Sequence, residues 1–403
     1  MLRGDSSGCS SQTRMRTWNM KIGRGGSFGS FSADLMWAGI FTSMKLVREW
    51  LGMPRSQYRL MTVPFPFEDG LLSPSMIQRW LVELMRGFPR GFEMGAREVL
   101  EFVKVEHTLF SLPFVLIGFV LADKEFGSDI SDGFWIIFAA VGARGLAMVL
   151  NRIIDRDIDA ENPRTASRHL PSGTISIQSS WVLAGLFLSM LLFSAWMLNE
   201  VALKMSWLPV VAFVIYPYTK RVTWLCHFWI GFCLALAPAG AWVAIAADHH
   251  GWEAIFGIGQ EQLEFLWFPE VFFISLGVAL WITAFDVNYA LMDKEVDREQ
   301  GIKSFPAAFG STKTRDLSVL LTIGWVICFL LAGMHEFSES GRFSSPVWIL
   351  SAISMGVVNL YVMTKRADLS SDSAQLMEAY QSTLFLSSML TGWVLLGSMI
   401  YVG

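Results

Sequence analysis

Residues 133–159 read GFWIIFAAVGARGLAMVLNRIIDRDID, and this stretch decides the fold of the chain. Its first part, 133–152, is apolar except for Arg144 and the last two residues. About 20 helical residues span about 30 Å, which is the thickness of the hydrocarbon core of a bilayer. Asp155, Asp157 and Asp159 follow at once. The stretch therefore predicts a transmembrane helix that ends in a cluster of carboxylates.

A second stretch of this kind reads Asp286-Val-Asn-Tyr-Ala-Leu-Met-Asp293-Lys-Glu-Val-Asp297 and also ends a long apolar run. On a continuous helix the side chains of Asn151, Asp155 and Asp159 share one face, and those of Asp286, Asp293 and Asp297 share another. Carboxylates so close together repel one another at low dielectric, and a divalent cation removes that conflict. Mg²⁺ is the hard cation that carboxylates and substrate phosphates hold together. The two motifs predict Mg²⁺ and a phosphorylated substrate, and their similarity hints at an old duplication.

Composition places the chain in the membrane class. Of 403 residues, 53% are hydrophobic and 16% are charged, whereas a soluble globular protein has roughly 25% charged residues. Four cysteines form no C-x-x-C pair and indicate neither a disulfide framework nor a zinc site. Apolar runs of about 20 residues recur along the chain, and runs of this length predict membrane-spanning helices, not a β-barrel. We expect an all-α polytopic membrane protein with nine spans, at about 106–123, 133–152, 178–198, 202–217, 223–247, 270–291, 316–334, 345–364 and 380–402.

Loop charge predicts the orientation of these spans. The loops after the second, fourth, sixth and eighth spans hold thirteen Lys and Arg residues, and the opposite loops hold only Lys124, Lys204 and Arg342. Basic loops stay in the cytoplasm, so both aspartate motifs are expected on the cytoplasmic side of the membrane. We expect an integral protein of a bacterial inner (plasma) membrane, with no nucleic-acid partner.

Residues 1–95 differ from the remainder, 96–403, which forms the predicted transmembrane domain. The first 33 residues are rich in Gly and Ser and are expected to be disordered. The segment 77–86 has the pattern of an amphipathic surface helix. Two alternatives stay open: translation starts at an internal methionine such as Met94, or the extension is a transit peptide.

Basic side chains accompany the acids. Arg164 and Arg168 follow the first motif, Lys303 follows the second, and Lys220 follows the fourth span. Arg binds phosphate through two parallel hydrogen bonds and Lys binds it as a point charge, so the three loops form a plausible diphosphate cradle. Arg144 lies inside a span, about 10 Å deeper than Asn151 on the same helical face. Such an intramembrane Arg predicts a functional site with an anionic partner.

These motifs resemble the UbiA family of intramembrane aromatic prenyltransferases. The likeness covers about residues 98–403 and extends to Glu-His-Thr-Leu-Phe-Ser-Leu-Pro at 106–113, the segment 151–165, Tyr-Thr-Lys-Arg at 218–221 and Leu-Ala-Pro-Ala-Gly-Ala-Trp at 236–242. Within the family these stretches resemble the 4-hydroxybenzoate polyprenyltransferase-like branch, which includes the MqnP-type enzymes of the futalosine route to menaquinone. The long N-terminus departs from the family pattern.

The resemblance implies transfer of a prenyl group from a polyprenyl diphosphate to a hydroxylated aromatic acid in quinone biosynthesis. It implies one Mg²⁺ on Asn151, Asp155 and Asp159 and a second on Asp293 and Asp297. Arg164, Arg168, Lys220 and Lys303 would neutralise the diphosphate, and the prenyl tail would lie between helices open to membrane lipid. Arg144 would hold the carboxylate of the aromatic acceptor. We interpret Asp286 as the group that hydrogen-bonds the acceptor hydroxyl or takes a proton.

Several alternatives remain at this point. The acceptor is 4-hydroxybenzoate, or it is 1,4-dihydroxy-6-naphthoate, because Arg144 suits either carboxylate. Haem farnesylation and chlorophyll prenylation belong to the same family but fit Arg144 less well. A CDP-alcohol phosphotransferase requires a D-G-x-x-A-R pattern that this sequence lacks. A cation transporter would place its acids near the middle of the membrane, whereas these acids end the helices.

Overall fold

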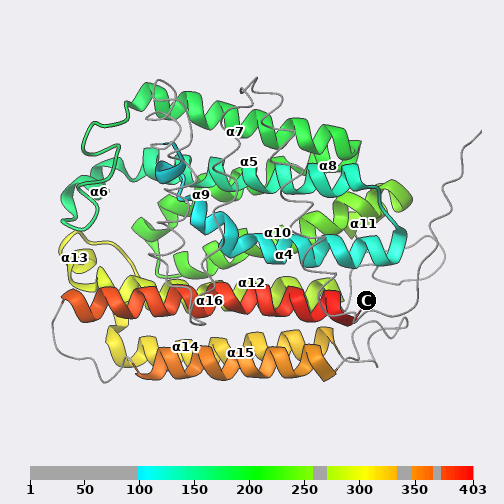
Figure 1. Cartoon of the computed structure of the whole chain (residues 1–403). Helices are drawn as coiled ribbons and strands as arrows, with labels where there is room; N and C mark the ends of the chain where they lie inside the picture. Colours follow the sequence, from blue (N-terminus) through cyan, green and yellow to red (C-terminus); the bar gives the residue numbers. More distant parts are fainter. Residues whose placement is uncertain (1–98, 257–269, 334–345, 366–373, 403) are drawn as a thin grey trace, which may run out of the picture. The chain divides into compact units, whose positions relative to one another are not determined.

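The computed structural model describes residues 99–256, 270–333, 346–365 and 374–402, and every regular element in these ranges is a helix (Figure 1). Eight helical segments in them are long and apolar enough to cross a membrane. The prediction of an all-α polytopic membrane protein is confirmed. The N-terminal extension, 1–95, lies outside the described residues.

The eight segments follow one another in chain order. They are α5 (Ile130–Ile154), α7 (Ile177–Leu198), α8 (Glu200–Met205) with α9 (Trp207–Val222), α10 (Cys226–His250), α12 (Glu270–Tyr289) with the 3-10 helix η2 (Ala290–Met292), α14 (Phe305–Ala332), α15 (Pro346–Lys365) and α16 (Ala374–Val402). The shorter helices are α6 (Arg156–Glu161), α11 (Glu253–Phe256) and α13 (Lys294–Glu299). The first predicted span, 106–123, coincides with α4 (Val105–Phe126), which is not among the eight, so the count of nine stays a prediction.

The predicted fourth span is interrupted at Ser206, between α8 and α9. Pro209 explains the break, because a proline has no N–H to bond the carbonyl of Met205 and its ring would collide with that carbonyl. Pro209 falls instead in the first turn of α9, where no intrahelical N–H bond is lost. Asn199 starts α8 by accepting a hydrogen bond from the N–H of Ala202 at 2.8 Å.

Close backbone approach holds the central helices together. α10 packs against α4, α9 and α12. A Cβ added to Gly118 of α4 would lie 2.2 Å from the carbonyl oxygen of Pro238 in α10, so only glycine permits this crossing. Trp281 of α12 packs against Phe114 of α4, and Trp325 and Phe329 of α14 add two more fully buried rings to the same core. The helices around the predicted site are therefore held in a fixed arrangement.

Both aspartate motifs occur at the same kind of helix break. Asp155 ends α5 and precedes the six-residue α6 with φ −92° and ψ 5°. Asp293 ends η2 and precedes the six-residue α13 with φ −93° and ψ 4°. We expected each motif to continue one helix. The structure corrects this, because the chain turns at the central aspartate of each motif. The matching geometry supports the hint of a duplication.

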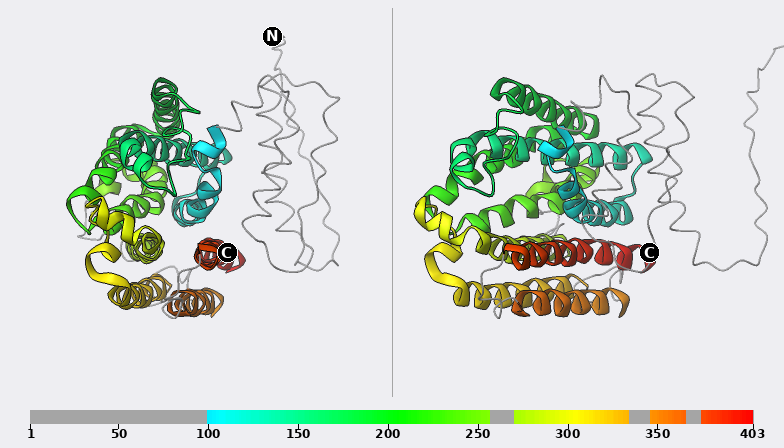
Figure 2. Two further views of the ribbon diagram at one scale, coloured as in Figure 1. Left: turned by 90° about the vertical axis from the view of Figure 1, so that its left-hand side faces the viewer. Right: turned by 60° about the vertical axis from the view of Figure 1, so that its left-hand side comes forward.

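The two breaks lie at the same end of the helices. Figure 1 shows α6 and α13 side by side there, and Figure 2 presents this end from two further directions. A glycine with positive φ follows each break, Gly173 (φ 76°) before α7 and Gly301 (φ 72°) before α14. The fold therefore brings together two segments that are far apart in the sequence.

Candidate active site

Asp155 is the most deeply buried acid of the first motif. Its side chain is 2% exposed, and its Oδ2 accepts hydrogen bonds from Asn151 Nδ2 at 2.9 Å and from Lys220 Nζ at 2.6 Å. The other oxygen, Oδ1, is buried and has no hydrogen-bond partner within the described part of the chain, although Arg221 lies 3.6 Å away. Burial raises the pKa of the Asp155 carboxyl, and the charge of Lys220 offsets only part of this effect.

Asp159, one turn further on in α6, faces a different cation. Arg168 places one guanidinium nitrogen, NH1, 2.8 Å from both carboxylate oxygens of Asp159. The Oγ of Thr165 donates to the carbonyl of Asp159 at 2.8 Å and so holds the connecting loop against α6. The first motif thus carries two buried carboxylates, each already beside a basic side chain.

The second motif meets the loop of the first at Asp293. Arg164 donates from Nε to Asp293 Oδ1 at 2.8 Å and from its NH2 group to Oδ2, and Asn162 Nδ2 lies 3.2 Å from Oδ1. Burial raises the pKa of the Asp297 carboxyl, which a hydrogen bond from Ser304 lowers in part. The two motifs, separate in the sequence, therefore share one ionic network.

The third basic loop joins this network through Lys220. While its Nζ contacts Asp155, its carbonyl accepts a hydrogen bond from the N–H of Lys303 at 2.7 Å. The side chain of Lys303 is exposed. Arg164, Arg168 and Lys220 of the predicted diphosphate cradle thus contact the predicted metal-binding aspartates, whereas Lys303 contributes its backbone and presents its side chain to solvent.

The residues present fit Mg²⁺ better than a metal held by protein alone. No group of three or more His, Cys, Asp or Glu side chains in the described ranges is close enough to hold one ion. Mg²⁺ usually takes one or two carboxylates and completes its shell with water and substrate phosphates. The orphaned Oδ1 of Asp155 offers such an oxygen, and the donors of both motifs are all hard oxygens.

A cavity of about 540 Å³ begins at the first motif and continues among the helices. Asn151, Arg168, Asp286, Tyr216 and Tyr289 supply polar atoms to its lining. Most of the remaining lining is apolar, including Ile136, Leu191, Leu198, Ala202, Met205, Ala244 and Ile255. Because Ile136 and Asn151 are both in α5, the cavity extends about 22 Å along that helix. It combines a polar end with a long apolar body.

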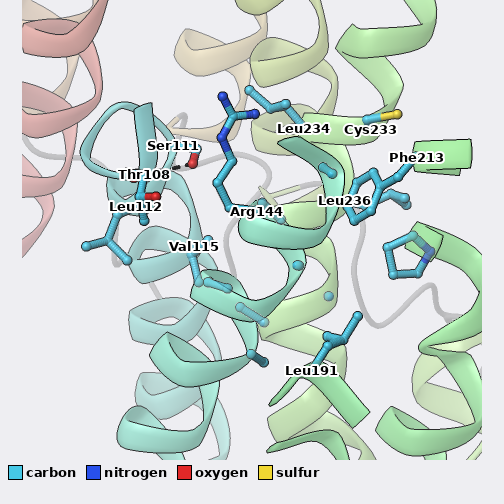
Figure 3. Close-up of a pocket in the computed structure, with 18 of the residues that line it drawn as sticks. Thr108, Ser111, Leu112, Val115, Arg144, Leu191, Phe213, Cys233, Leu234 and Leu236 are labelled. Atoms are coloured by element: carbon cyan, nitrogen blue, oxygen red, sulfur yellow. Dashed lines mark hydrogen bonds between the residues drawn. The ribbon is translucent and has the colours of Figure 1, made fainter. Parts of the chain in front are cut away.

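Arg144 lines the same cavity from the middle of α5. Figure 3 shows its side chain reaching toward Ser111 of α4 and Leu234 of α10. Arg144 and Asn151 are both in α5, seven residues apart, which places Arg144 about 10 Å further along the helix from the first motif. The arrangement places a guanidinium beside an apolar space that also reaches the first motif.

Asp286 lines this cavity too, and its partner is His227, which belongs to neither aspartate motif. Oδ2 of Asp286 lies 2.7 Å from Nδ1 of His227, whose side chain is 4% exposed. The sequence does signal His227, as an ionisable residue near the start of an apolar span. Its partner could not be predicted, because the contact joins α10 to α12 across 59 residues of sequence.

The family model for the UbiA prenyltransferase family matches residues 111–389, which contain both motifs, all three basic loops and Arg144. The chain belongs to the UbiA prenyltransferase family. It is therefore an enzyme, and the recognition drawn from its motifs is confirmed.

Relatives and solved structures of this family agree with the match. The chain is 30% identical over 228 residues to a 4-hydroxybenzoate octaprenyltransferase of Vibrio parahaemolyticus. The matched region covers 55% of this chain and 71% of the relative. The corresponding protein of Vibrio campbellii is 29% identical over 227 residues, with the same coverage. The apo structure of a UbiA homologue from Aeropyrum pernix has a TM-score of 0.59 and 27% identity, and covers 74% of this chain and 98% of that one.

A UbiA homologue from Archaeoglobus fulgidus, solved with geranyl diphosphate (GPP) and Mg²⁺, has a TM-score of 0.51. It is 17% identical and covers 74% of this chain and 99% of that one, so its likeness concerns the fold.

Proposed function

We propose that this UbiA-family enzyme transfers a polyprenyl group from a polyprenyl diphosphate to the ring of a hydroxylated aromatic carboxylic acid. One observation carries the proposal: the ionic network of the two motifs adjoins the polar end of an apolar cavity that Arg144 and Asp286 also line. A diphosphate suits the network, a prenyl chain suits the apolar body, and an aromatic acid suits the guanidinium. The names of the Vibrio relatives support the same substrates.

The ionic network suggests how the diphosphate is received. Arg164 beside Asp293, Arg168 beside Asp159 and Lys220 beside Asp155 neutralise one another in pairs. We propose Asn151, Asp155 and Asp159 as ligands of one Mg²⁺ and Asp293 with Asp297 as ligands of a second. When bound, Mg²⁺ supplies positive charge that stabilises the leaving diphosphate. The three cations then turn from the carboxylates to the phosphate oxygens.

The bond changes follow from these placements. The allylic C–O bond breaks and its electron pair stays on the diphosphate, where Arg164, Arg168 and Lys220 stabilise the growing negative charge. The apolar wall excludes water from the allylic cation. Arg144 holds the acceptor carboxylate so that a ring carbon forms the new C–C bond. Asp286 accepts a hydrogen bond from the acceptor hydroxyl and takes the proton released as the ring regains aromaticity.

We further propose that residues 96–403 form the catalytic domain of an integral protein of the bacterial inner membrane, with both motifs on the cytoplasmic side. The charge distribution of the loops supports this orientation. The acceptor is 4-hydroxybenzoate in our first proposal, which the names of the relatives support. The alternative acceptor is 1,4-dihydroxy-6-naphthoate of the futalosine menaquinone pathway, which has the same carboxylate and ring hydroxyl.

Prenyl transfer by membranes that contain the full-length protein tests the proposal. Radiolabelled geranyl diphosphate is supplied with Mg²⁺, and the two acceptors are offered in separate reactions, with a chelator as the metal control. Product from one acceptor identifies the pathway as well as the reaction. If folded protein gives no product with either acceptor, also with longer prenyl diphosphates, the proposed reaction is wrong.

A further inference from the structure

His227 makes two hydrogen bonds that together fix which of its ring nitrogens carries the proton. It is the second residue of α10 and only 3% exposed. Its Nε2 lies 3.1 Å from the backbone nitrogen of Phe305, and its Nδ1 lies 2.7 Å from Asp286 Oδ2. A backbone N–H can only donate, so Nε2 must accept and the proton of the neutral ring sits on Nδ1. His227 therefore donates to the carboxylate of Asp286.

We propose that His227 is the positioning residue of Asp286, an inference that rests on the proposed function of the site. By holding Oδ2, the imidazole leaves Oδ1 as the oxygen that meets the acceptor hydroxyl. Asp286 lines the cavity, whereas His227 is packed behind it. His227 thus acts through Asp286 and does not touch the acceptor itself.

The surroundings of His227 favour a fixed ring. Thr283 of α12, three residues before Asp286, places its Oγ1 3.1 Å from the carbonyl of His227. The hydroxyl shares its one proton between that carbonyl and the carbonyl of Ala279 at 2.7 Å. The start of α10 is thereby held against the helix that carries the carboxylate. A histidine anchored at its backbone and at both ring nitrogens cannot turn away from Asp286 without losing several hydrogen bonds.

The same ring connects Asp286 to the loop of the second motif. Phe305 is the first residue of α14 and comes two residues after Lys303, whose N–H bonds the carbonyl of Lys220. Lys220 in turn contacts Asp155. His227 therefore lies between the acceptor side of the cavity and the loops proposed to receive the diphosphate.

His227 takes no proton in the proposed reaction. The proton released from the acceptor goes to Asp286 Oδ1, and no bond to His227 needs to break. Nε2 is occupied by the N–H of Phe305, so the ring is not placed to take that proton. Its contribution is to orient the carboxylate and to stabilise its ionised form.

Two conservative substitutions separate the two hydrogen bonds. The amide nitrogen of an asparagine reaches the position of Nδ1, and the amide of a glutamine reaches that of Nε2. His227→Asn thus keeps the donor to Asp286, whereas His227→Gln keeps a partner for Phe305. His227→Ala removes both, and His249→Gln, at the opposite end of α10, is the matched control.

The experiment measures steady-state prenyl transfer with the full-length protein and these variants. We expect His227→Asn to stay within a few-fold of the wild-type kcat, and His227→Gln and His227→Ala to lose about 10²-fold. The KM for the prenyl diphosphate stays unchanged in all of them. Adding His227→Gln to Asp286→Ala causes no further loss, because the histidine acts only through that carboxylate.

Several outcomes overturn the inference: equal activity in His227→Asn and His227→Gln, a rise in the KM for the prenyl diphosphate alone, or additive losses in the double variant. If the wild type transfers no prenyl group, the proposed function fails and the positioning is read directly. ¹⁵N chemical shifts of the His227 ring then report the Nδ1–H tautomer, which the N–H of Phe305 should keep in place, and the Nδ1 shift should move in Asp286→Ala because the acceptor of its proton is lost. An Nδ1 shift that is the same in the wild type and in Asp286→Ala rejects the proposal independently of activity.

Discussion

Arg164 and Asp293 form a two-pronged ion pair that joins the loop of one aspartate motif to the helix break of the other. The two residues are 129 positions apart in the sequence. Arg164 is proposed to bind diphosphate and Asp293 to bind Mg²⁺, so the pair holds two ligand-binding groups against each other. Substrate and metal must both compete with this contact.

Replacing Arg164 with Ala should change the affinities for metal and substrate in opposite directions. Mg²⁺ should bind more tightly without substrate, because Asp293 loses its competing cation. The KM for the prenyl diphosphate should rise about tenfold or more, since a charged hydrogen bond contributes roughly 1.5–3 kcal/mol. Calorimetry of Mg²⁺ and transfer kinetics measure the two effects. Arg156→Ala is the control, because within the described ranges the ion pair of Arg156 is with the exposed Asp157. A loss of both affinities would contradict the exchange of partners.

Replacing Asp155 or Asp293 with Asn should lower Mg²⁺-dependent transfer by at least about 10²-fold, because each change removes a charged oxygen from the proposed metal site. Both proteins should still insert into membranes. Asp157→Asn provides a matched control within the first motif, since the side chain of Asp157 is 96% exposed. Normal turnover in the Asp155 and Asp293 variants would refute the metal assignment.

Arg144→Ala should raise the KM for the aromatic acid far more than the KM for the prenyl diphosphate. The guanidinium lies in the cavity lining, on α5 seven residues before Asn151, and it is proposed to hold only the acceptor carboxylate. Arg144→Lys should recover part of the affinity, because it restores the charge without the two-pronged geometry. Equal effects on both substrates would remove this role.

Mg²⁺ binding should weaken as the pH falls, and should do so at a higher pH than an ordinary aspartate predicts. Burial raises the pKa of Asp155 and Asp297 above the usual 3.8, so each carboxyl keeps its proton to a higher pH. Mg²⁺ needs the ionised form; its affinity is therefore full above the raised pKa and is lost as the pH drops through it. Titrations of Mg²⁺ from about pH 8 to about pH 5 measure the effect. In Asp155→Asn the dependence on pH should be shallower, and an unchanged slope would contradict the assignment.

Gly118→Ala should destabilise the protein by about 1–3 kcal/mol, because the added methyl group would overlap the carbonyl of Pro238 and force α4 away from α10. Gly185→Ala is the matched helical control, since an added Cβ there meets no atom within 4 Å. Thermal unfolding of both variants in detergent checks the difference. Similar unfolding temperatures would show that the two helices separate at little cost.

The helices were largely predictable because a bilayer imposes one rule, the length of an apolar run, on every span. The finer geometry was less accessible. The turns at Asp155 and Asp293 interrupt helices whose residue pattern continues through them, and no Gly or Pro marks either position. Pro209 does mark the break before α9, which falls inside the predicted span 202–217.

Within the site, residues close in sequence were easier to predict than partners from different helices. The spacing of Asn151, Asp155 and Asp159 is visible in one segment. The contact of His227 with Asp286 depends on how α10 packs against α12, which no local pattern encodes. Lys303 shows the reverse case: its charge predicts a diphosphate contact, yet its contact with Lys220 is made by its backbone N–H.

The shared turn at Asp155 and Asp293 means that the cavity is lined by two versions of one wall. Counting back from each aspartate, Asn151 corresponds to Tyr289, Met148 to Asp286 and Arg144 to Ile282, and all six residues line the cavity. Two identical subunits would have presented the same side chains twice. In this chain the two walls carry different side chains, because Asp286 lines the cavity from one wall and Arg144 from the other. The result is a chamber with two unlike walls, which suits the proposed joining of two unlike substrates.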